Sequence, residues 1–281
     1  MHRAWLPVAC LLASACGQPV DRAAEGSDVS TAETSGPYFV DISQVDYAFG
    51  MPREIPSGWI TFRAPNLGKE HHVAVFLRLP EGVTRSDWHE GLAALHETGT
   101  LPDWWDDLGD AGGTGAVAPG LTAQTTMWME PGLYGVLCGV IAPDGTSHWA
   151  HGMQAVFEVT EEKSGAPEPE ATIRLSLGAD GFRQEGTVTA GTHTVAVYFA
   201  DQPELTHDVH VARLGPDDDI QMAVDLMARP IEPFPLTFVG GAEQGPEGRT
   251  DYFTATFETG RYAWVCHLHA STGMVHEFTV E

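Results

Sequence analysis

Two segments of this 281-residue chain repeat one pattern of residues, and this internal repeat limits the possible folds more than any other feature. HHVAVFLRL (71–79) matches HDVHVARL (207–214), PGLYGVLC (131–138) matches TGRYAWVC (259–266), and HGMQAVFEV (151–159) matches TGMVHEFTV (272–280). A helix-like segment follows the first of these matches in both copies. The chain therefore reads as two copies of one domain.

The repeated runs are rich in Val, Thr, Phe and Tyr and alternate apolar with polar residues, which is typical of strands. With 31 Gly and 19 Pro and no long helical periodicity, turns join them. One short helix is expected in each copy, over 84–97 and 217–228. The stretch 101–120, full of Gly and Pro, is expected to be a loop. We predict an all-β fold of two tandem Greek-key β-sandwich domains, each with one short helix.

The N-terminus predicts export. Residues 1–16 have a basic start, a short apolar run and small residues, which is typical of a signal peptide and too short to span a bilayer. Ala13-Ser14-Ala15-Cys16 resembles a bacterial lipobox, so we expect lipidation at Cys16 and a membrane-anchored protein in the periplasm or on the cell surface. Ordinary secretion is the alternative. The predicted parts are a signal at 1–16, a polar tether at 17–35, domain 1 at 36–160, a linker at 161–171 and domain 2 at 172–281.

Charge limits the partners. The chain has 14 Lys and Arg against 39 Asp and Glu, a formal net charge of -25. Such acidity argues against nucleic acid and against electrostatic adhesion to anionic lipid. A macromolecular partner is expected to be basic, although acidity that only keeps the protein soluble is an open alternative.

The repeat aligns two sets of metal-binding residue types. Near the C-terminus, Cys266, His269 and Met274 have the spacing C-x2-H-x4-M, and His207 lies on an earlier predicted strand; the first copy offers His72, Cys138, His148 and Met153, with the spacing C-x9-H-x4-M. A thiolate, imidazoles and a thioether form a soft, low-coordination site that suits copper. Each residue alone has a plainer reading as core or strand, and a disulfide between the two cysteines is a further alternative. The remaining candidates are interpreted as residues at the surface or behind the metal-binding side chains: His71, His151, His210, His267 and His276.

The C-terminal motif with its upstream histidine resembles the plastocyanin and pseudoazurin branch of the cupredoxins. The first copy resembles bacterial cupredoxin-like lipoproteins, with NLGKEHH (66–72), PGLYGVLC (131–138) and DGTSHWAHGM (144–153). These resemblances imply a type 1 copper site in which a Cys thiolate and two imidazoles form a plane and a Met is axial. They also imply electron transfer with a redox partner such as a cytochrome or a reductase.

Other functions remain open. Two-domain cupredoxin enzymes, such as copper oxidases and nitrite reductases, commonly carry a histidine directly before the ligand cysteine, where this chain has Leu137 and Val265. An electron carrier is therefore favoured over an enzyme, with a copper carrier or storage protein and a metal-free interaction module as alternatives. We expect the second centre to be the better electron-transfer site. Its ligand loop is short and His269 should face outward, whereas the longer first loop should be freer and Trp149 should cover His148.

Overall fold

The computed structural model describes residues 36–202 and 206–281. The predicted signal peptide, the lipidation at Cys16 and the tether lie outside the described residues. The first half contains β1 (Phe39–Asp41), β2 (Ser43–Val45), β3 (Ala48–Gly50), β4 (Glu54–Pro65), β5 (His72–Arg78), α1 (Arg85–Thr98), η1 (Trp105–Asp107), β6 (Gly109–Val117), β7 (Thr122–Met129), β8 (Gly132–Leu137) and β9 (Gln154–Lys163). The second half contains β10 (Ile173–Gly178), β11 (Gly181–Glu185), β12 (Gly191–Phe199), β13 (Val209–Leu214), α2 (Ile220–Ala228), β14 (Thr237–Ala242), β15 (Thr250–Phe257), β16 (Gly260–Val265), η2 (Ala270–Thr272) and β17 (Val275–Val280).

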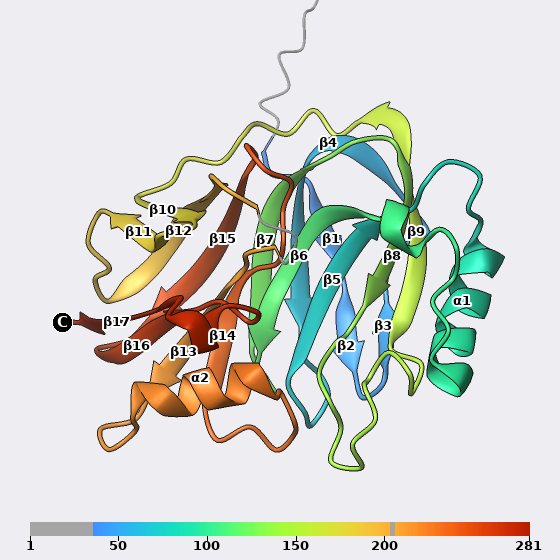
Figure 1. The fold of residues 1–281 in the computed structure, drawn as a ribbon. Coiled ribbons are helices and arrows are strands. Elements are labelled where there is room, and N and C mark those ends of the chain that lie inside the picture. Colours follow the sequence, from blue (N-terminus) through green and yellow to red (C-terminus); the bar gives the residue numbers. More distant parts are fainter. Residues whose placement is uncertain (1–35, 203–205) are drawn as a thin grey trace, which may run out of the picture. The chain divides into compact units, whose positions relative to one another are not determined.

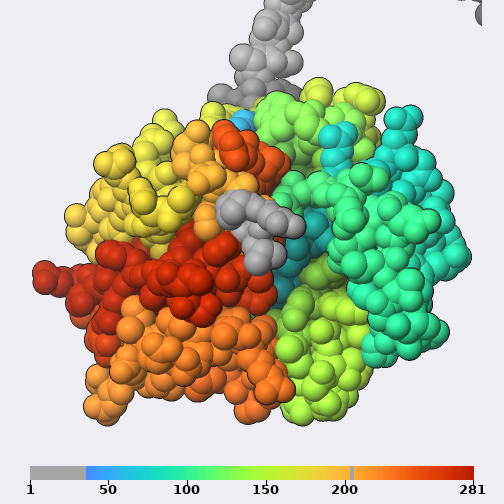
Figure 2. All heavy atoms as spheres, viewed as in Figure 1, coloured from blue at the N-terminus to red at the C-terminus, as the bar shows by residue number. Residues whose placement is uncertain are grey.

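Two sheet layers pass through both halves (Figure 1). One layer has the order β11-β10-β12-β15-β7-β4, and the other has the order β9-β8-β5-β6-β14-β13-β16-β17. The long strand β4 belongs to both, because it pairs with β7 in one layer and with β9 in the other. The halves are joined by the antiparallel pairs β7–β15 and β6–β14. In Figure 2 the orange and red atoms of the second half accordingly meet the green atoms of the first. The all-β prediction, with one short helix in each half, is confirmed.

Apolar side chains from the two layers fill the interior of each half. Phe62 and Phe76 meet edge to face in the first half, and Phe253 and Trp264 do so in the second. All four side chains are buried, and each contributes about 1.5–3 kcal/mol by leaving water. The period-2 pattern of the strands points these side chains inward, between the two layers.

The two helices lie on the second layer. Thr84 caps α1 through a capping box with Asp87, and Gly99 ends it in the left-handed conformation. The buried Trp88 packs over Gly135 of β8, where a Cβ would come within 2.5 Å of the indole ring. Asp219 caps α2. Among the described residues, no helix is long and apolar enough to cross a membrane.

The prediction of a loop over 101–120 is wrong for its second part, because Gly109–Val117 form the largely buried strand β6. Its glycines permit the pairing where the halves meet. Gly113 has a φ of 141°, and a Cβ on Gly115 would lie 2.7 Å from the Cα of Gly241 in β14. Glycine in a strand often marks such a close backbone approach. The Gly-rich sequence therefore reflects contact between the two halves.

Candidate metal centres

The first centre forms where two neighbouring strands end. His72 is the first residue of β5, and Cys138 directly follows β8, which pairs with β5. His148 comes from the loop before β9. The Cys138 Sγ lies 3.9 Å from the His72 Nδ1 and 3.5 Å from the His148 Nδ1, and the two ring nitrogens are 3.1 Å apart. All three side chains are buried.

Backbone hydrogen bonds fix the ligand loop of the first centre. The Cys138 amide donates to the Met153 carbonyl over 3.1 Å, and the Met153 amide donates to the His148 carbonyl over 2.9 Å. In the spacer between Cys138 and His148, the Ile141 amide donates to the Pro230 carbonyl of the second half over 2.9 Å. The expectation that this longer loop is freer is therefore wrong. The spacer is tied to the other half of the molecule.

The second centre repeats this arrangement. His207 precedes β13 and Cys266 follows β16, which pairs with β13. The Cys266 Sγ lies 3.9 Å from the His207 Nδ1 and 3.6 Å from the His269 Nδ1, and the two nitrogens are 3.2 Å apart. The Met274 amide donates to the His269 carbonyl over 3.0 Å. A separation above about 5 Å between sulfur and nitrogen would have been incompatible with one shared ion.

These donor sets fit a trigonal copper ion. Bonds of about 2.0 Å to nitrogen and about 2.3 Å to sulfur place two nitrogens about 3.5 Å apart and each nitrogen about 3.7 Å from the sulfur. Both centres come close to those separations. Ring nitrogens that face each other at 3.1–3.2 Å need a proton or a cation between them. Met153 and Met274 are buried in the same apolar clusters as Cys138 and Cys266, respectively.

The cysteines themselves are free thiols, so the alternative of a disulfide between them is wrong. Burial raises the pKa of Cys138 to about 12 and raises the pKa of Cys266 as well. A thiol in this state gives up its proton only when a cation takes the proton's place. Binding of a metal ion at either centre would therefore release the thiol proton of its cysteine.

Among the described residues, carboxyl groups lie directly against the outer ring nitrogens of the histidines in the first centre. Asp46 Oδ1 lies 3.0 Å from the outer Nε2 of His72, and Asp46 also accepts hydrogen bonds from the Lys69 amide at 3.0 and 2.9 Å. Gly68 makes this contact possible, because a Cβ there would come within 2.2 Å of the Asp46 Oδ1. A carboxylate behind a ligand histidine fixes the ring orientation and makes the other nitrogen a stronger ligand.

Glu70 and Tyr47 cover the other histidine of the first centre. The Glu70 Oε2 lies 2.9 Å from the His148 Nε2 but is not aligned for a hydrogen bond with it, and the Tyr47 hydroxyl donates to the Glu70 Oε1 over 3.3 Å. The Tyr47 ring meets the His148 ring edge to face at 5.0 Å. Burial, followed by the neighbouring His72, lowers the pKa of His148 to about 4, so the ring is neutral and able to bind metal. Trp149, expected to cover His148, instead meets His96 edge to face.

The second centre is more open. His269 is partly exposed, and it lines a surface hollow together with His207, Asp180 and Thr272. The His207 Nε2 has no hydrogen-bond partner in the part of the chain that the structure describes. Burial and the nearby His269 lower the pKa of His207. Both rings are therefore available to a metal, and this centre faces the surface.

The remaining histidines lie outside both donor sets. His151 contacts Asp144 at the surface, and His276 is exposed. His71 and His210 are buried. The His71 Nδ1 lies 2.9 Å from the Glu232 Oε1 of the second half.

A third cluster joins Asp208, His210 and Glu243, whose donor atoms lie within 4.8 Å of one another. The Ala116 amide donates to the His210 Nδ1 over 3.0 Å, so that nitrogen keeps its lone pair and the ring proton sits on Nε2. Because Nε2 faces both carboxyl groups with a proton attached, it is not free to bind a metal. The Asp208, His210 and Glu243 side chains therefore interact with one another and do not form a copper site.

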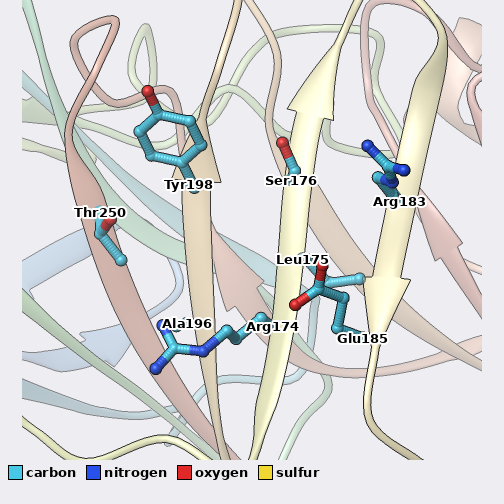
Figure 3. Close-up of a pocket in the computed structure, with 8 residues that line it drawn as sticks. All are labelled: Arg174, Leu175, Ser176, Arg183, Glu185, Ala196, Tyr198 and Thr250. Carbon is cyan, nitrogen blue, oxygen red and sulfur yellow. The ribbon is translucent and has the colours of Figure 1, made fainter.

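Sequence reasoning missed the acidic residues. Glu70 lies inside the NLGKEHH motif and Asp208 directly follows His207, so both carried a positional signal. Asp46 and Glu243 come from segments far from any motif, and only the fold brings them near the histidines. A separate hollow, on the outer face of β10 to β12 (Figure 3), holds exposed Arg174 and Arg183 and none of the predicted ligands.

No protein-family model and no curated protein matches the sequence. Among solved structures the chain is similar to reduced auracyanin from Roseiflexus castenholzii, with 21% identity over 44% of this chain and 98% of that chain and a TM-score of 0.28. It is also similar to a multicopper oxidase (16% identity, 86% and 88% of the two chains, TM-score 0.26) and to the copper nitrite reductase of Nitrosomonas europaea (15%, 87% and 93%, 0.24). TM-scores this low carry no argument, and the candidate centres rest on the donor atoms described above.

Proposed function

We propose that this protein is an extracytoplasmic copper protein that transfers electrons through type 1 copper centres. The observation that carries the proposal is the convergence, in each half, of one thiol and two ring nitrogens at separations suited to a trigonal copper ion. Bound copper would supply one-electron chemistry between Cu(I) and Cu(II). The chain holds the donors in place beforehand, which limits the rearrangement that accompanies a change of charge.

The two centres are proposed to have different roles. In the first, the carboxyl groups of Asp46 and Glu70 lie against the two neutral histidines and cover them, which favours firm retention of a charged ion. In the second, His269 reaches a surface hollow, which favours contact with a partner. We assign electron exchange with other proteins to the second centre.

Copper titration of single and double cysteine variants tests this proposal. Cys138→Ala and Cys266→Ala should each retain one equivalent of copper with the strong visible absorption of a Cu(II)–thiolate bond, and the double variant should have none. Electron exchange with a soluble donor should be much slower in Cys266→Ala than in Cys138→Ala. A colourless, copper-loaded wild-type protein would instead favour a carrier or storage role, for which the enclosure of the first centre is the supporting observation.

The cellular setting is part of the same proposal. We place the protein on the outer side of a membrane, anchored through a lipid on Cys16, with a basic redox protein as its partner because the chain carries a charge of -25. Cys16→Ser should move the protein from the detergent phase to the aqueous phase in a phase-partitioning experiment. Unchanged partitioning would contradict the anchor and leave the copper proposal intact.

A further inference from the structure

A cavity of about 430 Å³ lies between the loops that carry the two cysteines. Leu137 and Gly139, on either side of Cys138, line it from the first half, and His267 and Leu268, which follow Cys266, line it from the second. Its volume falls within the range of about 300–1,000 Å³ that is usual for small-molecule sites. Neither donor set uses this space.

The walls and the inner end of the cavity differ in chemistry. Val73, Val75, Met227 and Phe234 are among the apolar residues of the wall. Glu243 and His210 lie among its few polar groups, and both are buried. A cavity of this kind suits a ligand with an apolar body and one polar group.

Glu243 is the polar group without a partner. Its Oε1 makes no hydrogen bond with residues 36–202 or 206–281, and the closest imidazole nitrogen, the His210 Nε2, is 3.8 Å away. Asp208, by contrast, is already satisfied by the His267 amide and the Gln244 side chain. Leaving a buried carboxyl group without a donor is costly, so this position calls for a hydrogen-bond donor from outside the chain.

We propose that the cavity binds a small organic amine, with its apolar body between the two halves and its ammonium group on Glu243. Among the described residues that line the cavity, Glu243 carries the one carboxyl group and none is Lys or Arg, so an anion is disfavoured. A bare metal ion is disfavoured by the proton on the His210 Nε2 and by the apolar walls. The amine would contact the residues that flank both cysteines. Its binding needs no copper, so the inference stands apart from the proposed function.

Isothermal titration calorimetry on the full chain, at pH 8.5, tests the inference with three probes of one shape: 2-phenylethylamine, 2-phenylethanol and phenylacetate. At that pH most of the Glu243 carboxyl is ionised, because burial raises its pKa to about 8. The amine should bind at least tenfold more tightly than the alcohol, a difference of about 1.4 kcal/mol, and phenylacetate should not bind. Glu243→Gln should remove the preference for the amine, whereas Glu97→Gln, on the exposed side of α1, should keep it.

A second variant covers the case in which Glu243→Gln does not fold. Leu268 is 37% exposed at the cavity, so Leu268→Trp can fill the space without disturbing the core, and it should abolish amine binding. Equal affinities for amine and alcohol, unchanged amine binding in Glu243→Gln or Leu268→Trp, or no binding by any probe would each overturn the inference.

Discussion

At the scale of single residues, Asp46 and Glu70 make the first centre unlike the second. Both centres hold one thiol and two imidazoles, but within residues 36–202 and 206–281 only the histidines of the first have carboxyl groups at their outer ring nitrogens. A negative charge behind a ligand imidazole favours the more highly charged state of the metal. The first centre should therefore hold copper more tightly, and favour Cu(II) more, than the second.

Asp46→Asn isolates this effect, because it removes the charge and keeps the size of the side chain. Copper affinity at the first centre should fall by about 10- to 100-fold. The measurement is competition with a chromophoric chelator in the Cys266→Ala background, where only the first centre can carry a thiolate. Asp144→Asn, which alters an exposed carboxylate beside His151, is the matched control and should leave the affinity unchanged. An equal loss in both variants would contradict the role of Asp46.

Glu243 also predicts a pH dependence of stability. Burial raises its pKa from 4.5 to about 8, so between these values the folded chain keeps a proton that the unfolded chain has lost. The free energy of unfolding should therefore fall as pH rises from about 4.5 to 8 and level off above that. Glu243→Gln cannot ionise and should lack this part of the decline in urea unfolding at pH 5, 6.5 and 8. Asp208 and His210 face Glu243 and titrate in the wild type and in Glu243→Gln alike. If the difference in free energy of unfolding between wild type and Glu243→Gln does not change with pH, the decline does not come from Glu243.

At the scale of elements, the ligand loop of the first centre depends on the second half. Two residues of segment 230–234 contact the first half. The Pro230 carbonyl accepts a hydrogen bond from the Ile141 amide, and the Glu232 Oε1 is hydrogen-bonded to the His71 Nδ1. The Glu232 side chain also accepts from the Phe234 amide over 2.8 Å. One carboxylate thus joins the start of β5 to a loop of the other half.

Glu232→Ala should destabilise the protein by about 2–3 kcal/mol, because buried donors on His71 and Phe234 would lose their acceptor. Urea unfolding at neutral pH measures this change. Glu258→Ala is the comparison: it removes an exposed ion pair with Arg213, which is worth about 0–1 kcal/mol. Similar losses of unfolding free energy in Glu232→Ala and Glu258→Ala would mean that the Glu232 contacts between the halves contribute little to stability.

The sequence predicts elements that depend on local residues and misses those that depend on contacts with distant parts of the chain. The N-terminal cap and apolar periodicity predict α1 almost to the residue, since Thr84 acts through local geometry alone. The repeat identifies the six candidate thiol and imidazole groups, and the structure brings them together in two sets of three. The strand β6 is missed, because local propensity disfavours glycine and only contact with Gly241 explains it. Asp46 and Glu243 are missed for the same reason: their partners are distant in the chain.

At the scale of the whole molecule, the two layers make the halves depend on each other through backbone hydrogen bonds as well as side chains. Tyr252 to Thr254 of β15 pair with Gln124 to Thr126 of β7, and β14 pairs with β6. Glu232 and the amine cavity lie along the same junction. Binding at this junction is therefore in a position to affect both candidate centres.

This pairing implies that the halves would not behave as independent fragments. Residues 36–160 made alone would leave β6 and β7 as unpaired sheet edges, and 172–281 would do the same for β14 and β15. Open edges recruit further strands, so each fragment should self-associate or aggregate. Mixed during refolding, the two fragments should complement each other as a one-to-one complex, measurable by light scattering after size-exclusion chromatography. Stable monomers from each fragment would mean that the pairing between the halves is not needed for folding. Complementation would mean that the two halves fold as one unit.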